Sequence, residues 1–198
     1  MIAAMKTEIT RADILPLAAY ARDRKALRAD IVVMKRNRRV SVGLIATFYF
    51  ENYRTMWHQV HEMLFIEKGG AEQLPDELAA YNPLIPTGSE LVATVMFEID
   101  DPLRRARVLG MLGGVEHKAF IRVRGEMIRG VPEDDQERSR EDGKASSVQF
   151  IRFPFTPAQI AAFKGDAGDV VVGFDHANYG HMAVMSAPVR QALSGDFA

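Results

Sequence analysis

Residues 81–99 read YNPLIPTGSELVATVMFEI, an elbow with two prolines that runs directly into an alternating strand. Pro83 and Pro86 fix their own φ angles and favour extended geometry in the residues that precede them. Residues 85–88 have proline and glycine at the positions that a type I turn favours. After this turn every second side chain is apolar, which is typical of a strand with one face against a core. We therefore expect the elbow to set the angle at which this strand enters a sheet.

After the elbow, the chain runs twice through the order strand, helix, strand, strand. The first β-α-β-β unit spans residues 91–131, and the second spans residues 147–198 together with a terminal helix. In both units a capping side chain followed by proline predicts the helix start, at Asp101 and at Thr156. The shared order indicates either a duplication or two independent copies of a common supersecondary unit. Between the units, residues 132–146 are mostly charged or polar and predict a mobile, solvated loop.

A helical segment and an extra strand–helix pair precede these units. Residues 1–39 have a helical apolar stripe that ends in the basic run KRNRR, and residues 40–90 contain the strand, a helix and the elbow. Alternation over residues 40–50 predicts one long strand, and Asn52 can cap the helix that follows it. We expect this strand to pair with the strand after the elbow, and both long helices to cover one face of the sheet. The predicted fold is a single α+β domain, residues 1–198, with a mostly antiparallel sheet.

The composition excludes several classes of function. The net charge is −1, which argues against a general nucleic-acid binder, because such proteins use excess cations to neutralise phosphates. The chain has no cysteine, which excludes disulfides, thiolate catalysis and a cysteine-ligated iron–sulfur cluster. Neither a run of about eighteen apolar residues nor an export signal occurs. We therefore expect a cytoplasmic protein that binds neither nucleic acid nor membrane.

Two loop segments carry polar side chains that could bind a small ligand. One is the elbow at residues 81–90, and the other is a predicted hairpin at residues 175–181 that contains a carboxylate, two histidines and a phenol. A histidine beside a carboxylate can transfer protons near neutral pH. Two arginines before the long strand could add positive charge nearby. The candidate ligand-binding residues are Arg38, Arg39, Tyr81, Asn82, Ser89, Glu90, Asp175, His176, Asn178 and Tyr179.

Each of these segments also has a purely structural interpretation. Turn chemistry alone explains the prolines and the glycine of the elbow. Asp175 and Asn178 can form hydrogen bonds to their own backbone in a hairpin loop. The basic run at residues 35–39 can complement the dipole of the helix that it ends, without binding any ligand.

One helix face offers candidate metal ligands. His58, His61 and Glu62 are spaced so that they adjoin on the helix that follows Asn52. Their order, HxxHE, matches neither the HExxH zinc motif nor the ExxH pattern of di-iron bundles. We therefore expect this face to be solvated, and the protein to hold no metal or other cofactor.

No phosphate-binding loop, dinucleotide fingerprint or hydrolase elbow occurs in the sequence. Its most distinctive phrases, besides the elbow and its strand, are ITRADILPL, KRNRRVSVG, FENYRT, QVHEML, VQFIRFPFTPAQIAAF and FDHANY. With these phrases the chain resembles, over nearly its whole length, the uncharacterised bacterial family known as domain of unknown function 3501. The resemblance implies an association with a rubrerythrin-like di-iron protein or an iron–sulfur oxidoreductase, and it implies no reaction.

Two classes of function are open. The leading hypothesis is a non-catalytic cytoplasmic accessory or binding protein, linked to the rubrerythrin-type, peroxide-handling redox system that the resemblance implies. The alternative is a small-molecule-binding protein or enzyme that uses the elbow and the hairpin at residues 175–181. In that case Tyr81 and His176 should lie within about 10 Å of each other across one pocket. A buried polar pocket that joins the two segments would favour the enzyme, and an exposed apolar patch would favour the accessory role.

Overall fold

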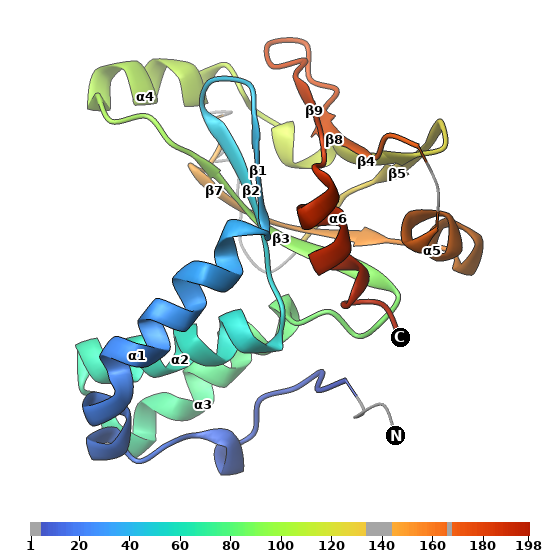
Figure 1. The fold of residues 1–198 in the computed structure, drawn as a ribbon. Coiled ribbons are helices and arrows are strands. Elements are labelled where there is room, and N and C mark those ends of the chain that lie inside the picture. The colour runs from blue at the N-terminus through green and yellow to red at the C-terminus, as the bar shows by residue number, and fades with distance from the viewer. Residues whose placement is uncertain (1–4, 134–143, 166–167) are drawn as a thin grey trace.

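The computed structural model describes residues 5–133, 144–165 and 168–198, which form a layer of helices and two sheets (Figure 1). The main helices are α1 (Leu17–Arg36), α2 (Tyr53–Glu67), α3 (Gly70–Tyr81), α4 (Pro102–Gly110), α5 (Pro157–Lys164) and α6 (Ala187–Ser194). Short 3₁₀ turns are η1 (Arg11–Asp13), η2 (Asn82–Leu84) and η3 (Val115–Lys118). The strands are β1 (Arg39–Val42), β2 (Ala46–Phe50), β3 (Glu90–Phe97), β4 (Ala119–Val123), β5 (Glu126–Arg129), β6 (Val131–Pro132), β7 (Val148–Pro154), β8 (Val171–Phe174) and β9 (Met182–Val184).

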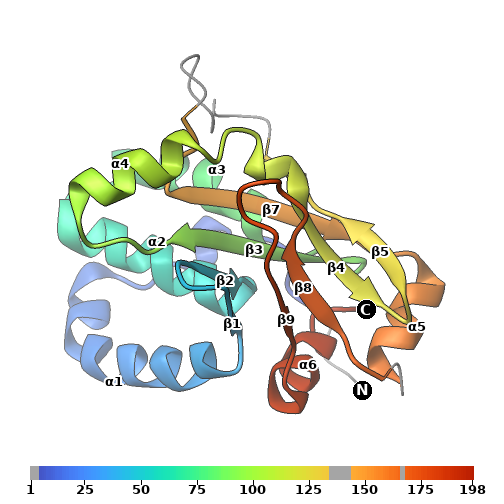
Figure 2. The same cartoon turned by 90° about the horizontal axis from the view of Figure 1, so that it is seen from above.

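Both sheets are antiparallel, which confirms the predicted α+β class. The first sheet has the order β1-β2-β3-β7-β6, and the second sheet has the order β5-β4-β8-β9. The strand that follows the elbow, β3, is the central strand of the first sheet, between β2 and β7. In Figure 2 the second sheet lies at the right of the view, and α1 and α2 lie at the left.

The main core lies between the two sheets. The inward faces of the first sheet contribute side chains such as Phe48, Leu91 and Phe153, which are almost fully buried. The second sheet contributes Ile121 and Phe174, and the rings of Phe48 and Phe174 lie 5.0 Å apart. The alternation that predicted these strands is therefore the alternation between this core and the opposite face of each sheet.

A second, smaller core lies on the other face of the first sheet. There Val92 of β3 packs with Met56, Trp57 and Val60 of α2 and with Leu74 of α3. The expectation that the two long helices cover this face is correct for α2 only, because α1 packs along α2 (Figure 1). The face of α2 that points away from the sheet is consequently covered by α1.

The predicted long strand at residues 40–50 is instead a hairpin. β1 and β2 pair with each other, Val42 opposite Ala46, and β2 alone pairs with β3. Gly43 has a φ of +66° at the turn, and Leu44, which the alternation placed in the core, is 91% exposed. The prediction was wrong here because the apolar alternation continues through the turn, while the left-handed backbone of Gly43 reverses the chain.

The two β-α-β-β units occupy corresponding places in the fold. Their first strands, β3 and β7, are antiparallel neighbours in the first sheet, and their second strands, β4 and β8, are antiparallel neighbours in the second. In the second sheet, the second strand of each unit (β4 or β8) lies at the centre and the third strand (β5 or β9) lies at the edge. A two-fold relation between the units would produce this arrangement, which suits either a duplication or convergence. Most of the loop predicted between them, residues 134–143, lies outside the described residues.

Candidate functional site

The polar side chains of the elbow form hydrogen bonds that hold neighbouring segments of the fold in place. Asn82 holds the amino-terminal segment with both atoms of its amide: Nδ2 donates to the carbonyl of Ile9 over 3.0 Å, and Oδ1 accepts from the Ile9 N–H over 2.8 Å. The Glu90 carboxylate accepts from the Thr87 N–H and from Arg152 Nη1, at 2.8 and 2.7 Å. Burial raises the pKa of Glu90, but the hydrogen bonds from Thr87 and Ser89 and the charge of Arg152 outweigh burial and lower it.

The hairpin at residues 175–181 is likewise bonded to the structure around it. The Tyr179 hydroxyl donates to the Val42 carbonyl over 2.7 Å and accepts from the N–H groups of Ile45 and Ala46. Its neighbours in the hairpin are also bonded. Asn178 Nδ2 donates to the Met111 carbonyl over 2.8 Å, and His176 Nε2 lies 3.2 Å from the Gly113 carbonyl oxygen. Asp175, which is exposed, accepts a hydrogen bond from Arg129. The hairpin therefore covers one end of the core between the two sheets.

The structure does not bring the elbow and the hairpin together. The elbow leads into the first residue of β3, Glu90, whereas Tyr179 holds the turn beside the last residue, Phe97, which pairs with Ala46. At about 3.3 Å per residue, the eight residues of β3 separate these ends by more than about 20 Å. Tyr81 packs with the helical layer and Tyr179 with the core between the sheets, on opposite faces of the first sheet. A single pocket shared by the two segments is therefore not formed.

The two candidate arginines have different surroundings. Arg38 is only 4% exposed, and its guanidinium donates to the carbonyls of Phe50 and Glu51 and to the carboxylate of Asp196. Burial raises the pKa of Asp196, and the nearby Arg38 opposes that rise. Arg39, the next residue, is exposed on β1. Arg38 therefore ties the carboxyl-terminal segment to the junction of β2 and α2.

A partly buried polar cluster, which the sequence did not predict, joins α1 to α2. Arg24 donates to both carboxylate oxygens of Glu62 through Nε and Nη2, each at 2.8 Å, and the Tyr20 hydroxyl donates to the same carboxylate over 2.6 Å. The bonds from Arg24 hold the pKa of Glu62 at about 2, although burial opposes them. Burial and the bond to Glu62 raise the pKa of Tyr20. The carboxylate is therefore ionised throughout the neutral range.

This face of α2 is not solvated, contrary to the prediction, because His61 is buried and His58 is partly buried. His61 is 2% exposed; its Nδ1 lies 2.7 Å from the Trp57 carbonyl oxygen, and its Nε2 accepts from the Leu15 N–H over 3.0 Å. This pattern requires a neutral ring with the proton on Nδ1. Because both nitrogens of His61 and both oxygens of Glu62 are bonded, these side chains do not face a common metal position. Within the described ranges no group of three or more His, Asp or Glu side chains could hold a metal ion.

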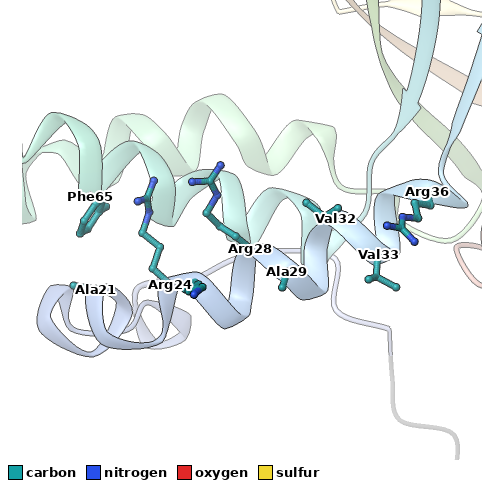
Figure 3. Close-up of a pocket in the computed structure, with 9 residues that line it drawn as sticks. Ala21, Arg24, Arg28, Ala29, Val32, Val33, Arg36 and Phe65 are labelled. Carbon is teal, nitrogen blue, oxygen red and sulfur yellow. The ribbon is translucent and has the colours of Figure 1, made fainter.

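A basic groove runs along the exposed side of α1, next to the cluster of Tyr20, Arg24 and Glu62 (Figure 3). It has a volume of about 700 Å³ and is open to solvent. Arg24 stacks on the Phe65 ring of α2 with its guanidinium carbon 4.6 Å from the ring centre, which forms one wall. The side chains that line the rest of the groove are the cations Lys25, Arg28 and Arg36 and the apolar residues Ala21, Ala29, Val32 and Val33.

Of the four cations that line this basic groove, only Arg24 is paired with a described residue, Glu62. Lys25, Arg28 and Arg36 form no ion pair with any residue that the structure describes, and no Asp or Glu lines the groove. Val32 and Val33 are 57% and 61% exposed, although both are β-branched apolar residues in the last turns of a helix. Apolar side chains beside unpaired cations are typical of an interaction surface.

Lowering the pH from about 7.5 to 5 is expected to destabilise the protein. Burial lowers the pKa values of His58 and His61, so below the ordinary value of about 6.5 the unfolded chain binds protons that the folded chain does not. The free energy of unfolding is highest above about pH 6.5 and falls as the pH drops below this value, by at most about 1.4 kcal/mol per pH unit for each histidine. Urea unfolding at a series of pH values measures this slope.

The variant that tests this prediction is His61→Gln. His61→Gln should flatten the slope between pH 6.5 and 5, because it removes the buried ring. Equal slopes in the wild type and in His61→Gln would contradict the prediction.

Comparisons with known proteins agree with the fold and give no reaction. The model of a family described as Protein of unknown function (DUF3501) matches residues 8–197. A crystal structure described as a novel protein of unknown function from Burkholderia pseudomallei K96243 is similar, with a TM-score of 0.88 and 35% sequence identity over 96% of this chain and 99% of that chain. No match was found among curated proteins. No helix in the part of the chain that the structure describes could cross a membrane.

Proposed function

Because this chain belongs to the DUF3501 family, which is described only as being of unknown function, we propose a function from its surface: a non-catalytic accessory protein that binds a partner protein through the basic groove on α1. The observation that carries this proposal is the combination of three unpaired cations with two exposed valines along one helix. Binding of a partner to such a surface is favoured both by the burial of apolar side chains and by complementary charge.

The partner segment that suits this groove is an acidic amphipathic helix. Lys25 and Arg36 are eleven positions apart on α1, or roughly 16 Å at 1.5 Å per residue, which is about three turns of a second helix. The apolar face of that helix would cover Val32, Val33 and Phe65, while carboxylates on its flanks would meet the cations. Nucleic acid is a poorer occupant, because the groove offers apolar side chains where a phosphate backbone needs cations.

The catalytic alternative has less support. The polar groups of the elbow and of the hairpin at residues 175–181 are bonded largely to nearby backbone, as Asn82 is to Ile9 and Tyr179 is to Val42. The two segments lie at opposite ends of β3 and do not share a pocket. An exposed surface with apolar and basic residues is what the accessory role requires.

The partners that we propose to test are those that the family resemblance implies: a rubrerythrin-like di-iron protein and an iron–sulfur oxidoreductase, both in the cytoplasm. Each would be purified from the same host and titrated against this protein by biolayer interferometry at low and high salt. We expect one of them to bind, and we expect binding to weaken as salt rises, because exposed charge pairs are screened.

Two groove variants and one control make the test specific. Arg28→Glu and Val32→Asp should each weaken binding by about tenfold or more, since one reverses a charge and the other places a charge in the apolar contact. Arg107→Glu makes the same charge reversal on α4, outside the groove, and should leave binding unchanged. Absence of binding to both proteins, or equal weakening by the control, would overturn the proposal.

A further inference from the structure

A second cavity, of about 370 Å³, lies between the start of α1 and the helices α2 and α3. It is distinct from the basic groove: Tyr20 lines the cavity and Arg24 lines the groove, and both side chains bond to Glu62 between them. Its volume is within the range of about 300–1,000 Å³ that small-molecule sites have.

The cavity wall is fixed before any ligand arrives. The segment between η1 and α1 is held over α2 by two hydrogen bonds: the Trp57 Nε1–H donates to the Asp13 carbonyl over 2.8 Å, and the Leu15 N–H donates to His61 Nε2 over 3.0 Å. These bonds place the side chains of Ile14 and Leu15 on the cavity side. A preformed wall lowers the conformational cost of binding.

The lining combines apolar side chains with positively charged ones. Ile14, Leu15, Leu64 and Leu74 provide apolar surface from three elements of the fold. Arg11 and Lys68 also line the cavity, and no Asp or Glu among the described residues does.

The two cations of the lining, Arg11 and Lys68, are available to a ligand. Neither Arg11 nor Lys68 forms an ion pair with any described residue. Lys68 ends α2 in the left-handed conformation, with a φ of 57°, immediately before the chain turns into α3. His61, which lines the cavity together with Tyr20, is neutral because its Nε2 accepts a hydrogen bond, so it adds no charge to the lining.

We propose that this cavity binds an amphipathic monoanion, an apolar chain or ring with one carboxylate. The apolar portion occupies the space among the leucines, and the carboxylate lies at Arg11 and Lys68, where charge-assisted hydrogen bonds are the strongest available. A neutral apolar molecule leaves both cations unpaired, and a sugar lacks the apolar portion that the lining requires.

The test is isothermal titration calorimetry with decanoate, below its critical micelle concentration, and with decanol as the uncharged analogue. We expect decanoate to bind at a single site and decanol to bind at least about fivefold more weakly, since one exposed charge contact contributes roughly 1 kcal/mol. Lys68→Gln should weaken decanoate by a similar factor and leave decanol unchanged. Decanol binding as tightly as decanoate would overturn the assignment of the carboxylate.

A blocking variant tests the location. Ala71 lies in the first turn of α3 and lines the cavity, so Ala71→Phe should abolish decanoate binding. Ala79→Phe introduces the same side chain at an exposed position on the same helix outside the cavity, and it should bind decanoate like the wild type. Thermal unfolding of both variants shows that each is folded. Undiminished binding to Ala71→Phe, equal loss in Ala79→Phe, or no binding of decanoate to the wild type would refute the proposal.

Discussion

Replacing Arg38 with Met is expected to lower the free energy of unfolding by about 3–5 kcal/mol, because it leaves a buried carboxylate without its cation. The guanidinium of Arg38 bonds to the carbonyls of Phe50 and Glu51 at 3.0 and 2.9 Å as well as to Asp196. All of these bonds are buried, so water cannot replace the lost donor. Urea unfolding followed by far-UV circular dichroism measures the change.

The neighbouring arginine provides a matched control for this prediction. Arg39→Met changes the same side chain one position later, on an exposed face of β1, and should alter the free energy of unfolding by less than about 0.5 kcal/mol. The double variant Arg38→Met with Asp196→Leu should recover part of the loss, because it removes the orphaned charge as well. A loss in Arg38→Met as small as that in Arg39→Met would contradict the role assigned to the pair.

Replacing Tyr179 with Phe is expected to cost about 2–3 kcal/mol. The change removes one hydroxyl that accepts from two backbone N–H groups and donates to the Val42 carbonyl, at the turn between β1 and β2. The Ala46 N–H is buried, so it loses its partner without gaining water, which costs about 1–3 kcal/mol for such a group. The ring itself keeps its packing against Phe97 and Phe174.

Tyr49→Phe is the corresponding control. It removes a hydroxyl from β2 of the same sheet, but that hydroxyl donates over 2.7 Å to Glu98 in an exposed bond. Water can take its place, so we expect a loss below about 1 kcal/mol. Chemical denaturation of the two variants side by side decides the matter, and equal losses would count against Tyr179 as the residue that holds the turn.

The order of the elements was predictable from the sequence because it depends on local patterns. The alternation after the elbow and the cap–proline pairs at Asp101 and Thr156 correspond to β3, α4 and α5. Within the elbow, Asn82 was expected to be extended because it precedes Pro83, but it is helical, with φ −60° and ψ −38°, and belongs to η2. The hairpin at Gly43 was not predictable from alternation, because apolar periodicity records which face a side chain would take and not whether the chain reverses.

The candidate site was less predictable, because its residues meet through the packing of two helices. Glu62 is bonded to Tyr20 and Arg24, which lie 42 and 38 positions earlier in the chain, so no local pattern joins them. From the sequence alone, the polar face of α2 had the character of a solvated surface. One signal was present: Arg24 interrupts the apolar stripe of α1, and a charge on the buried side of a helix needs a partner of opposite sign.

The chain contains a single tryptophan, Trp57, and its position gives the protein an internal optical probe. The indole lies in the helical layer, 4.0 Å from the ring of His61 between centroids, and it contributes nothing to the core between the two sheets. Intrinsic tryptophan emission therefore reports on α1, α2 and α3, whereas the strand signal in circular dichroism reports on the sandwich. If the two transitions coincide during denaturation, the helices and the sheets unfold as one cooperative unit; if emission changes first, the helical layer opens while the sandwich stays folded.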